Sequence, residues 1–480
     1  MRPFIIITLL ALATALSSVT AGDSRTTYNI TDYGAVADGK TLCSPAIQSA
    51  IDASHQAGGG RVVIPSGTWL TGTVVMKDNV ELHLAAGATV LGSTKHADYP
   101  TFNPEYRSHK DINGFNALIY AEKAKNIAIT GSGTIDGQGA LQFPREGKQF
   151  TSDRDGRPRN ILFVSCQDIR VEGITMRNSG SWNQHYLNCE DVIVDRINVY
   201  NHANRNNDGI DIDGCRRFVL SNSTLDCDDD GICLKSTGPA ACEDITITNC
   251  VVSSHCNAIK TGTESTGGFK RITISDCTVK PSASKTKVFG RKEGITGITV
   301  GCVDGGICED INISNIKIEG TQVPIFVRLG KRNRPHTDGA TVTKDSTMSG
   351  ISISNITATG CGNWGCAILG LPGNRIKGLQ LHNINITFAG GGTEEHSQKV
   401  IKEKPRTYPQ STYWGKLPVY GLFIRNADQV SLKNLDLQVA KKDQRSPIWL
   451  EKINGLVLSD IKTAKAVSGQ PQVIRKNVTD

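Results

Sequence analysis

Residues 242–252 read Cys-Glu-Asp-Ile-Thr-Ile-Thr-Asn-Cys-Val-Val, and two parts of this stretch recur along the chain. The pattern Cys-x-x-apolar-x-apolar begins again at Cys166, Cys189, Cys215 and Cys308, and at Phe269 without the cysteine. The pattern apolar-x-Asn/Asp-apolar begins at Ile247, Ile274, Ile313, Ile353, Leu381, Leu432 and Leu458. Apolar residues at every second position predict strands with one buried face. The Asn or Asp predicts a turn, because its side chain can satisfy nearby backbone groups.

The spacing of these repeats favours a parallel β-helix. The copies at Cys166, Cys189, Cys215 and Cys242 follow one another too closely for propeller blades, which take roughly 40 residues each. A β-sandwich would need tight two-residue hairpin turns, and such turns are not the rule here. One coil of about three short strands fits the interval, and successive coils would stack about 4.8 Å apart. The sequence therefore predicts an all-β solenoid.

The N-terminal region predicts export and a capped solenoid. Residues 1–21 have a positive Arg2, an apolar core at residues 5–16 and small residues before position 22, as a signal peptide does. The apolar run is short for a membrane anchor. We therefore expect a secreted or periplasmic protein with no membrane anchor.

Residues 22–480 are predicted to form a single β-helix domain, with an entry and cap region at 22–125 and repeat coils at 126–480. Ser44 is the expected N-cap of a helix whose apolar face is Ala46, Ile47, Ala50 and Ile51, and residues 58–60 should stop it. This helix would cover the open end of the stacked coils. Segments 281–294, 331–349 and 388–418 are expected to leave the coil as long loops.

The fourteen cysteines have two expected roles. In an exported protein they are in a compartment that permits disulfides, and Cys361 with Cys366 could close a small loop. Most of the others stand at repeat positions and are expected to be buried as small apolar side chains. Because no paired Cys-x-x-Cys set is present, we expect no zinc site.

Two acidic segments can be superimposed, Asn-Asn-Asp-Gly-Ile-Asp-Ile-Asp at 206–213 and Asp-Asp-Asp-Gly-Ile-Cys-Leu-Lys at 228–235. Asp208 then meets Asp230, and both strands begin beside a glycine that leaves room for a close approach to the backbone. On successive coils, Asp208, Asp229 and Asp230 come together, as acid/base hydrolysis of a glycosidic bond requires. The alternative is that these carboxylates only cap backbone amides at the strand starts.

Over nearly the whole mature chain, the sequence resembles the family 28 glycoside hydrolases, which include polygalacturonases and rhamnogalacturonan-acting enzymes. The resemblance includes Asp-Tyr-Gly-Ala-Val-Ala-Asp-Gly-Lys at 32–40, Gly-Ser-Gly-Thr-Ile-Asp-Gly-Gln-Gly at 131–139 and the acidic motifs. It implies a right-handed parallel β-helix that hydrolyses pectic polysaccharide with inversion. It also implies that Asp229 is the general acid and that Asp208 and Asp230 activate water.

The chain departs from two motifs of the family. Aligned by the coil, Asn257 replaces the histidine of Gly-His-Gly and takes its place as a substrate-binding candidate. His255, two residues earlier, could reach the site from the turn; the alternative is a plain turn histidine. Arg-Ile-Lys, which binds the substrate carboxylate in polygalacturonases, has no copy, and Arg328 or the pair at 291–292 are candidate substitutes. Lys260 and Lys235 could hold a carboxylate or hydroxyl of the substrate; the alternative is that they are ordinary surface lysines.

Three further residues are placed by the register. Asp211 and Asp213 alternate with inward residues and should face outward, so Asp211 could touch substrate while Asp213 would be solvated. Trp182 should lie one coil below the acids, where its indole could stack on a sugar face; the alternative is that it covers the coil edge.

We conclude that the chain is an inverting glycoside hydrolase acting on galacturonan or rhamnogalacturonan. The missing motifs favour an unusual linkage, a chain-end mode or a rhamnogalacturonan-type substrate, and the long loops could wall off the groove, as a chain-end mode would need. The expected partner is plant cell-wall polysaccharide; no nucleic acid is expected, because the net charge is only +7 and no Lys/Arg run is present. We expect a monomer without cofactor or metal. Two alternatives are a β-helix polysaccharide lyase, which could bind calcium at the acids, and a β-helix that binds polysaccharide without catalysis.

Overall fold

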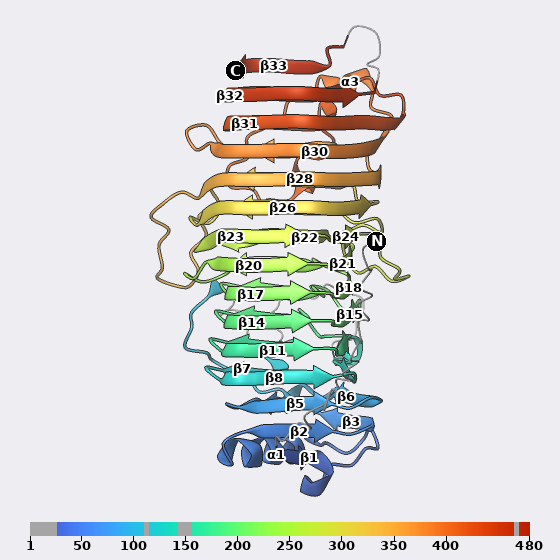
Figure 1. The fold of residues 1–480 in the computed structure, drawn as a ribbon, viewed down its shortest axis with the longest axis vertical. Helices are drawn as coiled ribbons and strands as arrows, with labels where there is room; N and C mark the ends of the chain where they lie inside the picture. Colours follow the sequence, from blue (N-terminus) through green and yellow to red (C-terminus); the bar gives the residue numbers. More distant parts are fainter. Residues whose placement is uncertain (1–25, 110–114, 143–155, 465–469) are drawn as a thin grey trace, which may run out of the picture.

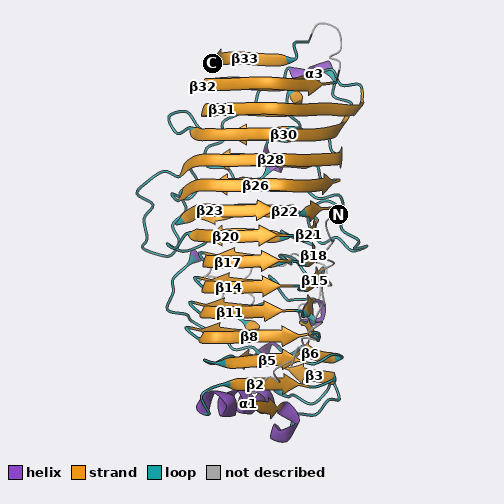
Figure 2. Ribbon diagram, viewed as in Figure 1, coloured by secondary structure: helices purple, strands orange, loops and turns teal. Residues whose placement is uncertain are grey.

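The computed structural model describes residues 26–109, 115–142, 156–464 and 470–480, which form a right-handed parallel β-helix (Figures 1 and 2). All 33 strands that these residues form belong to one hydrogen-bonded array, and every pairing between named strands is parallel. The array wraps into three sheets, one on each side of the coil. The predicted fold class is confirmed.

The sheet that carries the acidic motifs is called the site sheet here. It consists of β4 (Val74–Val75), β7 (Ala117–Glu122), β10 (Arg159–Val164), β13 (Gln184–Leu187), β16 (Ile210–Asp213), β19 (Ile232–Ser236), β22 (Asn257–Ser265), β25 (Thr296–Cys302), β27 (Val323–Leu329) and β29 (Cys366–Leu369).

The second sheet, called the broad sheet, faces the viewer in Figure 1. It consists of β1 (Thr27–Asn29), β2 (Gly60–Ile64), β5 (Val80–Leu84), β8 (Lys125–Gly131), β11 (Gln167–Glu172), β14 (Glu190–Asp195), β17 (Arg216–Ser221), β20 (Cys242–Thr248), β23 (Gly268–Ser275), β26 (Ile307–Glu319), β28 (Thr347–Cys361), β30 (Ile376–Gly390), β31 (Val419–Lys441) and β32 (Ser446–Thr463). The start of β31 also continues the site sheet, and β33 (Val473–Val478) pairs with the start of β32.

The third sheet consists of β3 (Gly67–Thr71), β6 (Ala88–Gly92), β9 (Thr134–Asp136), β12 (Thr175–Arg177), β15 (Asn198–Asn201), β18 (Thr224–Cys227), β21 (Val251–Ser254) and β24 (Thr278–Val279), and it continues into the end of β26.

The core lies inside the coil because alternate residues of each strand point inward. Ile245 and Ile247 of β20 are buried, whereas Thr246 between them is exposed. All fourteen cysteines are buried and free. This confirms the small-hydrophobe interpretation. Cys361 and Cys366 are free thiols in the same core cluster, so the disulfide that they could have formed is not present.

The repeated Asn and Asp residues form the predicted turns, each in the left-handed backbone conformation. Asn315, Asn355 and Asn383 have φ angles of 58°, 54° and 57°. Their side chains also stack from coil to coil, since Asn355 donates to Asn315 at 2.9 Å and accepts from Asn383 at 2.8 Å. The repeat thus selects Asn for its backbone tolerance and for an amide that bonds its copy in the next coil.

Helix α1 (Ser44–Gln56) covers the N-terminal end of the coils with the predicted face of Ala46, Ile47, Ala50 and Ile51 (Figure 1). The N-cap is Cys43 rather than Ser44, because the Ser44 hydroxyl instead accepts from the backbone of Gly72 at 2.7 Å. The parallel pairing of β2, β5 and β8 shows that stacking already begins in the segment expected to be only an entry region.

The remaining helices are short and lie outside the coil. They are α2 (Gly139–Gln142), α3 (Glu394–Ser397) and the 3-10 turns Ile30–Tyr33, His96–Asp98 and Ser411–Tyr413. The three predicted long loops connect β24 to β25, β27 to β28 and β30 to β31. In the described residues, no helix is long and apolar enough to cross a membrane. The predicted signal peptide lies outside the described residues.

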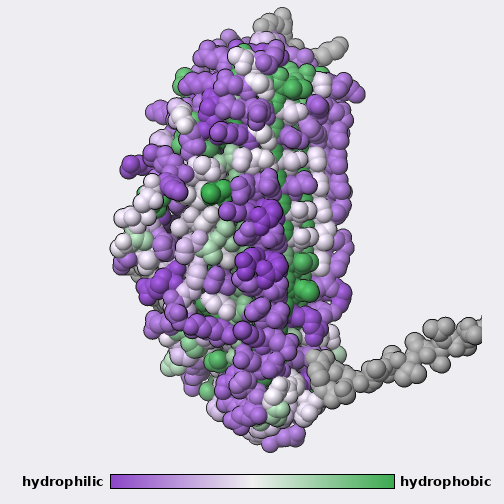
Figure 3. All heavy atoms as spheres, turned by 60° about the vertical axis from the view of Figure 1, so that its left-hand side comes forward, coloured by the Kyte–Doolittle hydropathy of each residue, from purple (hydrophilic) through white to green (hydrophobic). Residues whose placement is uncertain are grey.

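Figure 3 shows that hydrophilic side chains cover most of the face seen there, while hydrophobic colour is confined to a narrow lengthwise band and isolated spots. Most apolar side chains are therefore inside the coil, and the function must be sought among polar groups and loops on its outside.

We predict that Asn355→Ala lowers the free energy of unfolding by about 2 kcal/mol, since it removes two amide hydrogen bonds and places alanine at positive φ. Asn355→Gly should cost less, because glycine tolerates this conformation. Denaturant unfolding monitored by circular dichroism measures both. An alanine variant as stable as the parent would contradict a stabilising role for the asparagine stack.

Candidate active site

The acidic motifs lie at the starts of three stacked strands, β16, β19 and β22. The backbone of Gly209 donates to the carbonyl of Asp230 at 2.9 Å, and that of Gly231 donates to the carbonyl of Asn257 at 2.9 Å. Asp208, Asp230 and Asn257 therefore follow one another from coil to coil. Ile210 pairs with Ile232, as the superposition of the two segments predicted.

The two glycines beside the acids are required by the stacking itself. A Cβ on Gly209 would lie 2.6 Å from the carbonyl oxygen of Gly231, and one on Gly231 would lie 2.7 Å from that of Ala258. Real Cβ atoms do not approach so closely, so the close approach predicted at these glycines is made by the next coil.

Asp230 is the most strongly held of the three acids. One carboxylate oxygen lies 2.7 Å from the Nζ of Lys260, and the other accepts from the side-chain amide of Asn257 at 2.6 Å. Burial acts to raise the pKa of Asp230, but Lys260, Lys235 and these hydrogen bonds outweigh burial and lower it. Asp230 is therefore ionised at neutral pH.

Asp229 is half-buried, and its pKa is shifted in the opposite direction to that of Asp230. Burial and the adjacent carboxylate of Asp230 raise the pKa of Asp229 to about 6. The side-chain amide of Asn206 donates only a long hydrogen bond, of 3.5 Å, to the Asp229 carboxylate. Asp229 therefore holds a proton in mildly acidic solution.

Asp208 is buried beside Asp230, with carboxylate oxygens within 4.8 Å of one another. Burial, together with Asp211 and Asp229, raises the pKa of Asp208 well above its ordinary value. The Nζ of Lys235 lies 3.9 Å from Asp208 and 3.3 Å from Asp211, which is fully buried. Lys235 and Asp211 therefore stand behind the acids as a buried charged pair.

Loops complete a pocket of about 380 Å³ around Asp229 and Asp230. Its other lining residues are Arg205, Asn206, Asn257, Lys260, Phe289, Tyr408, Gln410, Thr412 and Tyr413. Phe289 comes from the loop at 281–294, and the last four come from the loop at 388–418, so two of the three predicted loops form walls. The guanidinium of Arg205 lies 5.6 Å from the Phe289 ring centre. These wall residues carry no repeat, which is why the sequence did not single them out.

The buried carboxylate of Asp228 connects one wall of the pocket to the coil that carries the acids. The Nδ1 of His255 lies 3.0 Å from the carboxylate of Asp228, the residue before Asp229. The same carboxylate accepts from the backbone amides of Val288 and Phe289 at 2.6 and 2.9 Å. Phe289 is thereby positioned by the segment that carries the acids.

Of the predicted site residues, Asp229, Asp230, Asn257 and Lys260 line the pocket, and Asp208 lies directly beside it. His255 faces Asp228 rather than the pocket. Arg328 is fully buried and donates to the carbonyls of Glu403 and Lys404, so it is occupied by the protein and does not line the pocket.

Three expectations of exposure are corrected. Asp211, expected to touch substrate, is fully buried and does not line the pocket. Asp213 is fully buried rather than solvated; it accepts from both the backbone and hydroxyl of Thr237 and lies 3.0 Å from His185. Trp182 is only 4% exposed, and its ring lies 4.6 Å from the Nζ of Lys235. Its indole therefore supports the charged residues behind the acids, and protein covers the face expected to take a sugar.

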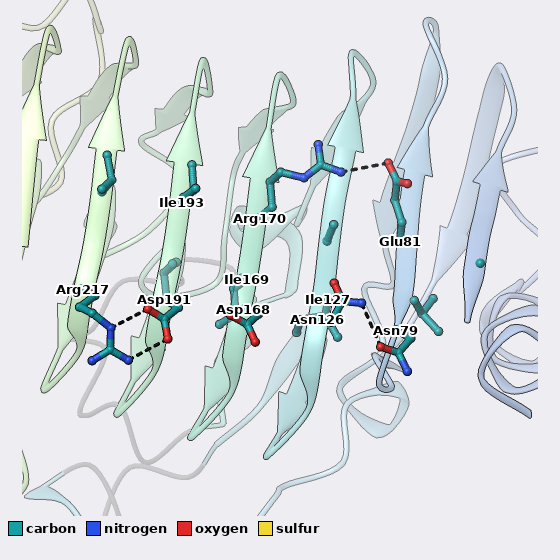
Figure 4. A pocket seen from close by; sticks show the side chains of 15 residues that line it. Asn79, Glu81, Asn126, Ile127, Asp168, Ile169, Arg170, Asp191, Ile193 and Arg217 are labelled. Atoms are coloured by element: carbon teal, nitrogen blue, oxygen red, sulfur yellow. Dashed lines mark hydrogen bonds and ion pairs between the residues drawn. The ribbon is translucent and has the colours of Figure 1, made fainter. Parts of the chain in front are cut away.

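A larger hollow, of about 490 Å³, lies on the outer face of the broad sheet and is shown in Figure 4. Its charged groups face one another, as Arg217 with Asp191 at 2.6 Å and Arg170 with Glu81 at 3.6 Å. Paired surface charges of this kind offer no group with an unusual protonation state. The smaller pocket, with its perturbed acids, is therefore the candidate active site.

Within the residues that the structure describes, two groups of side chains have the spacing of metal ligands, Asp208 with Asp230 and Cys233, and His202 with Asp228 and His255. In the first, the ammonium of Lys260 already neutralises Asp230. In the second, backbone amides already bind Asp228. A protonated carboxyl beside an ionised one instead suits acid/base chemistry.

Comparison with known proteins agrees with this chemistry. The model of glycosyl hydrolases family 28 matches residues 56–406. A probable polygalacturonase of Vitis vinifera is 25% identical over 383 residues, which cover 75% of this chain and 74% of that protein. An exo-poly-alpha-D-galacturonosidase of Dickeya chrysanthemi is 28% identical over 249 residues, covering 42% of this chain and 41% of that protein.

Among solved structures, an exopolygalacturonase of Thermotoga maritima has a TM-score of 0.66 with 21% identity, covering 86% of this chain and 91% of that one. The surface protein and adhesin PfbA of Streptococcus pneumoniae has a TM-score of 0.57 with 14% identity, covering 95% of this chain and all of that one. These structural likenesses show the fold alone, whereas the family match extends over most of the sequence. The chain belongs to glycosyl hydrolase family 28 and is a glycoside hydrolase.

Proposed function

We propose that this protein hydrolyses glycosidic bonds in pectic polysaccharide with inversion, by direct attack of water. The observation that carries the proposal is the opposite protonation of two adjacent acids in one pocket, Asp229 and Asp230. A general acid and a general base are both needed when water displaces the leaving sugar in one step.

In this mechanism Asp229 donates its proton to the oxygen of the leaving sugar, and Asp230 removes a proton from the attacking water. Asp208 lies within 4.8 Å of Asp230 and positions that water. Lys260 and Asn257 keep Asp230 ionised. Because Asp208 has a raised pKa, we assign it a positioning role and make Asp230 the base.

The names of the relatives support a pectic substrate, since a polygalacturonase and an exo-poly-alpha-D-galacturonosidase are among them. The loop walls of the pocket and the exopolygalacturonase relatives of Zea mays favour cleavage at chain ends. A polymeric substrate outside the cell also agrees with the export predicted from residues 1–21.

Experiment can distinguish the proposed hydrolase from two alternatives, a lyase and a binding protein. A lyase would leave a double bond that absorbs ultraviolet light, and an alginate lyase of Azotobacter vinelandii is 45% identical over 73 residues, or 13% of this chain. A binding protein would produce no new chain ends, and the fold by itself does not specify catalysis, since the adhesin PfbA shares it. Reducing ends without ultraviolet absorbance would support hydrolysis, and the anomeric form of the first product, read by NMR, would test inversion.

We predict that Asp229→Asn lowers kcat on pectic polymer by about 10²–10⁴-fold, the usual contribution of a general acid. The loss should be smaller on an aryl glycoside, because a good leaving group needs no proton. Asp244→Asn is the matched control, since that acid pairs with Arg271 at the surface. An equal loss on both substrates would contradict the acid role.

We predict a larger loss of kcat for Asp230→Asn than for Asp208→Asn. The pKa of Asp230 is lowered and that of Asp208 is raised, so an uncharged amide replaces an ionised group in the first case and a protonated one in the second. Steady-state kinetics on one substrate at pH 5 would rank them. A reversed order would assign the base to Asp208.

The pH profile of kcat/KM should be bell-shaped, with activity falling as pH rises through about 6, where Asp229 loses its proton. Activity should fall at low pH only where Asp230 becomes protonated, below its ordinary value. In Lys260→Gln the pKa of Asp230 rises, so the acidic limb should move up by about 1 pH unit.

Lys260→Arg retains the positive charge and serves as the control for that shift. Circular dichroism of both variants establishes that they fold. An acidic limb that stays in place in Lys260→Gln would show that Lys260 does not set the charge of Asp230.

A further inference from the structure

A second pocket lies beside the candidate active site and is lined by cations. It has a volume of about 310 Å³, and its lining residues are Lys399, Val400, Ile401, Lys402, Lys404, Tyr413 and Trp414. Tyr413 also lines the pocket that contains Asp229 and Asp230. One exposed aromatic side chain therefore forms a wall common to both pockets.

The lysines of this second pocket have no anionic partner among the described residues. The Nζ of Lys399 donates to the carbonyls of Trp414 and Lys416 at 2.7 and 2.6 Å. The Nζ of Lys404 donates to the carbonyl of Tyr413 at 2.5 Å. Carbonyl oxygens orient an ammonium group without neutralising it, and each ammonium has three N–H donors. Donors and positive charge both remain for a ligand.

A carboxylate of the same loop, Glu403, pairs with a residue outside the second pocket. Glu403 lies 3.5 Å from the guanidinium of Arg425, which is almost completely buried. Burial, followed by the positive charges of Lys404 and Lys416, lowers the pKa of Lys399. Bringing an anion into the pocket would offset these positive charges.

We propose that this second pocket is a subsite for a negatively charged sugar residue of the substrate, whose carboxylate is bound by Lys399, Lys402 and Lys404. The proposal rests on the proposed function and narrows it, because it makes the substrate a polyuronide chain that extends past Tyr413. The Tyr413 side chain is 50% exposed and offers an aromatic face on which a sugar ring between the two pockets can stack.

This subsite would also let the chain select a negatively charged substrate, although it lacks the Arg-Ile-Lys motif. Arg328, the expected substitute for that motif, is buried against carbonyls. Lys260 is engaged with Asp230. Lys399, Lys402 and Lys404 line the second pocket on the loop after β30 and have no ion-pair partner in the described part of the chain, so this loop can select for charge where the coil motif is missing.

Binding should be measured without turnover, using the full chain with Asp229→Asn and calorimetric titration with galacturonate oligomers of increasing length. The same titration with neutral galactose oligomers separates charge from shape. We expect the galacturonate oligomers to bind more tightly, and the difference to shrink as salt is added.

Lys402 is the residue to change, because the ammonium groups of Lys399 and Lys404 also hold the loop. Lys402→Gln should weaken binding of galacturonate oligomers that reach the second pocket by about three- to fivefold, and Lys402→Glu by about tenfold or more. The neutral oligomers should be affected much less. Lys377→Glu, on the exposed outer face of β30, is the matched control.

The inference is overturned if Lys402→Glu binds galacturonate oligomers as tightly as the parent at low salt, or if acidic and neutral oligomers lose affinity equally. Full competition by inorganic phosphate at matched concentration would also overturn the assignment to a sugar carboxylate. A parent that binds acidic oligomers through Lys402 but cleaves no pectic polymer would leave the subsite standing and refute the proposed hydrolysis.

Discussion

The parallel hydrogen bonding between coils is the constraint on which the rest of this structure depends. Each residue of a coil lies next to its equivalent in the following coil, about 4.8 Å away. Like residues are thereby brought together, which favours Asn355 beside Asn383 and isoleucine beside isoleucine. It also excludes any side chain at Gly209 and Gly231, where the next backbone is too close.

At the acidic motifs the same constraint brings like charges together. This is unfavourable unless neighbouring groups stabilise one charge or one carboxyl keeps its proton. Asp208 and Asp230 are stacked, and each is buried. Lys260 and Asn257 lie on the far side of Asp230, in the next coil, and stabilise its charge. Asp208 has the more distant Lys235 and takes a raised pKa. Position along the stack therefore determines which acid is ionised.

The repeats in the sequence predicted the strands of the coil and their register. They did not predict which parts of the coil other segments cover. The register of Asp208, Asp230 and Asn257 follows from period-two strands of matched length, and the structure has it. The same period correctly predicted that Asp213 points out of the coil. It could not show that another segment, at Thr237, covers Asp213 and keeps it from solvent. Phe289 and Tyr413 belong to loops without a repeat, so no pattern could place them in the pocket.

The coil and the loops contribute different parts of the candidate site. Backbone hydrogen bonds between the coils hold the acids in place. Rigid strands position catalytic groups more accurately than loops do. Loop residues then form the walls of the pocket around these acids. His255 and Asp228 join the two parts, because Asp228 binds the backbone of Phe289 on one side and is followed by Asp229 on the other. A displacement of this wall would therefore act directly on the segment that carries Asp229, the general acid of the proposed mechanism, so in that mechanism His255 is a positioning residue although it does not line the pocket.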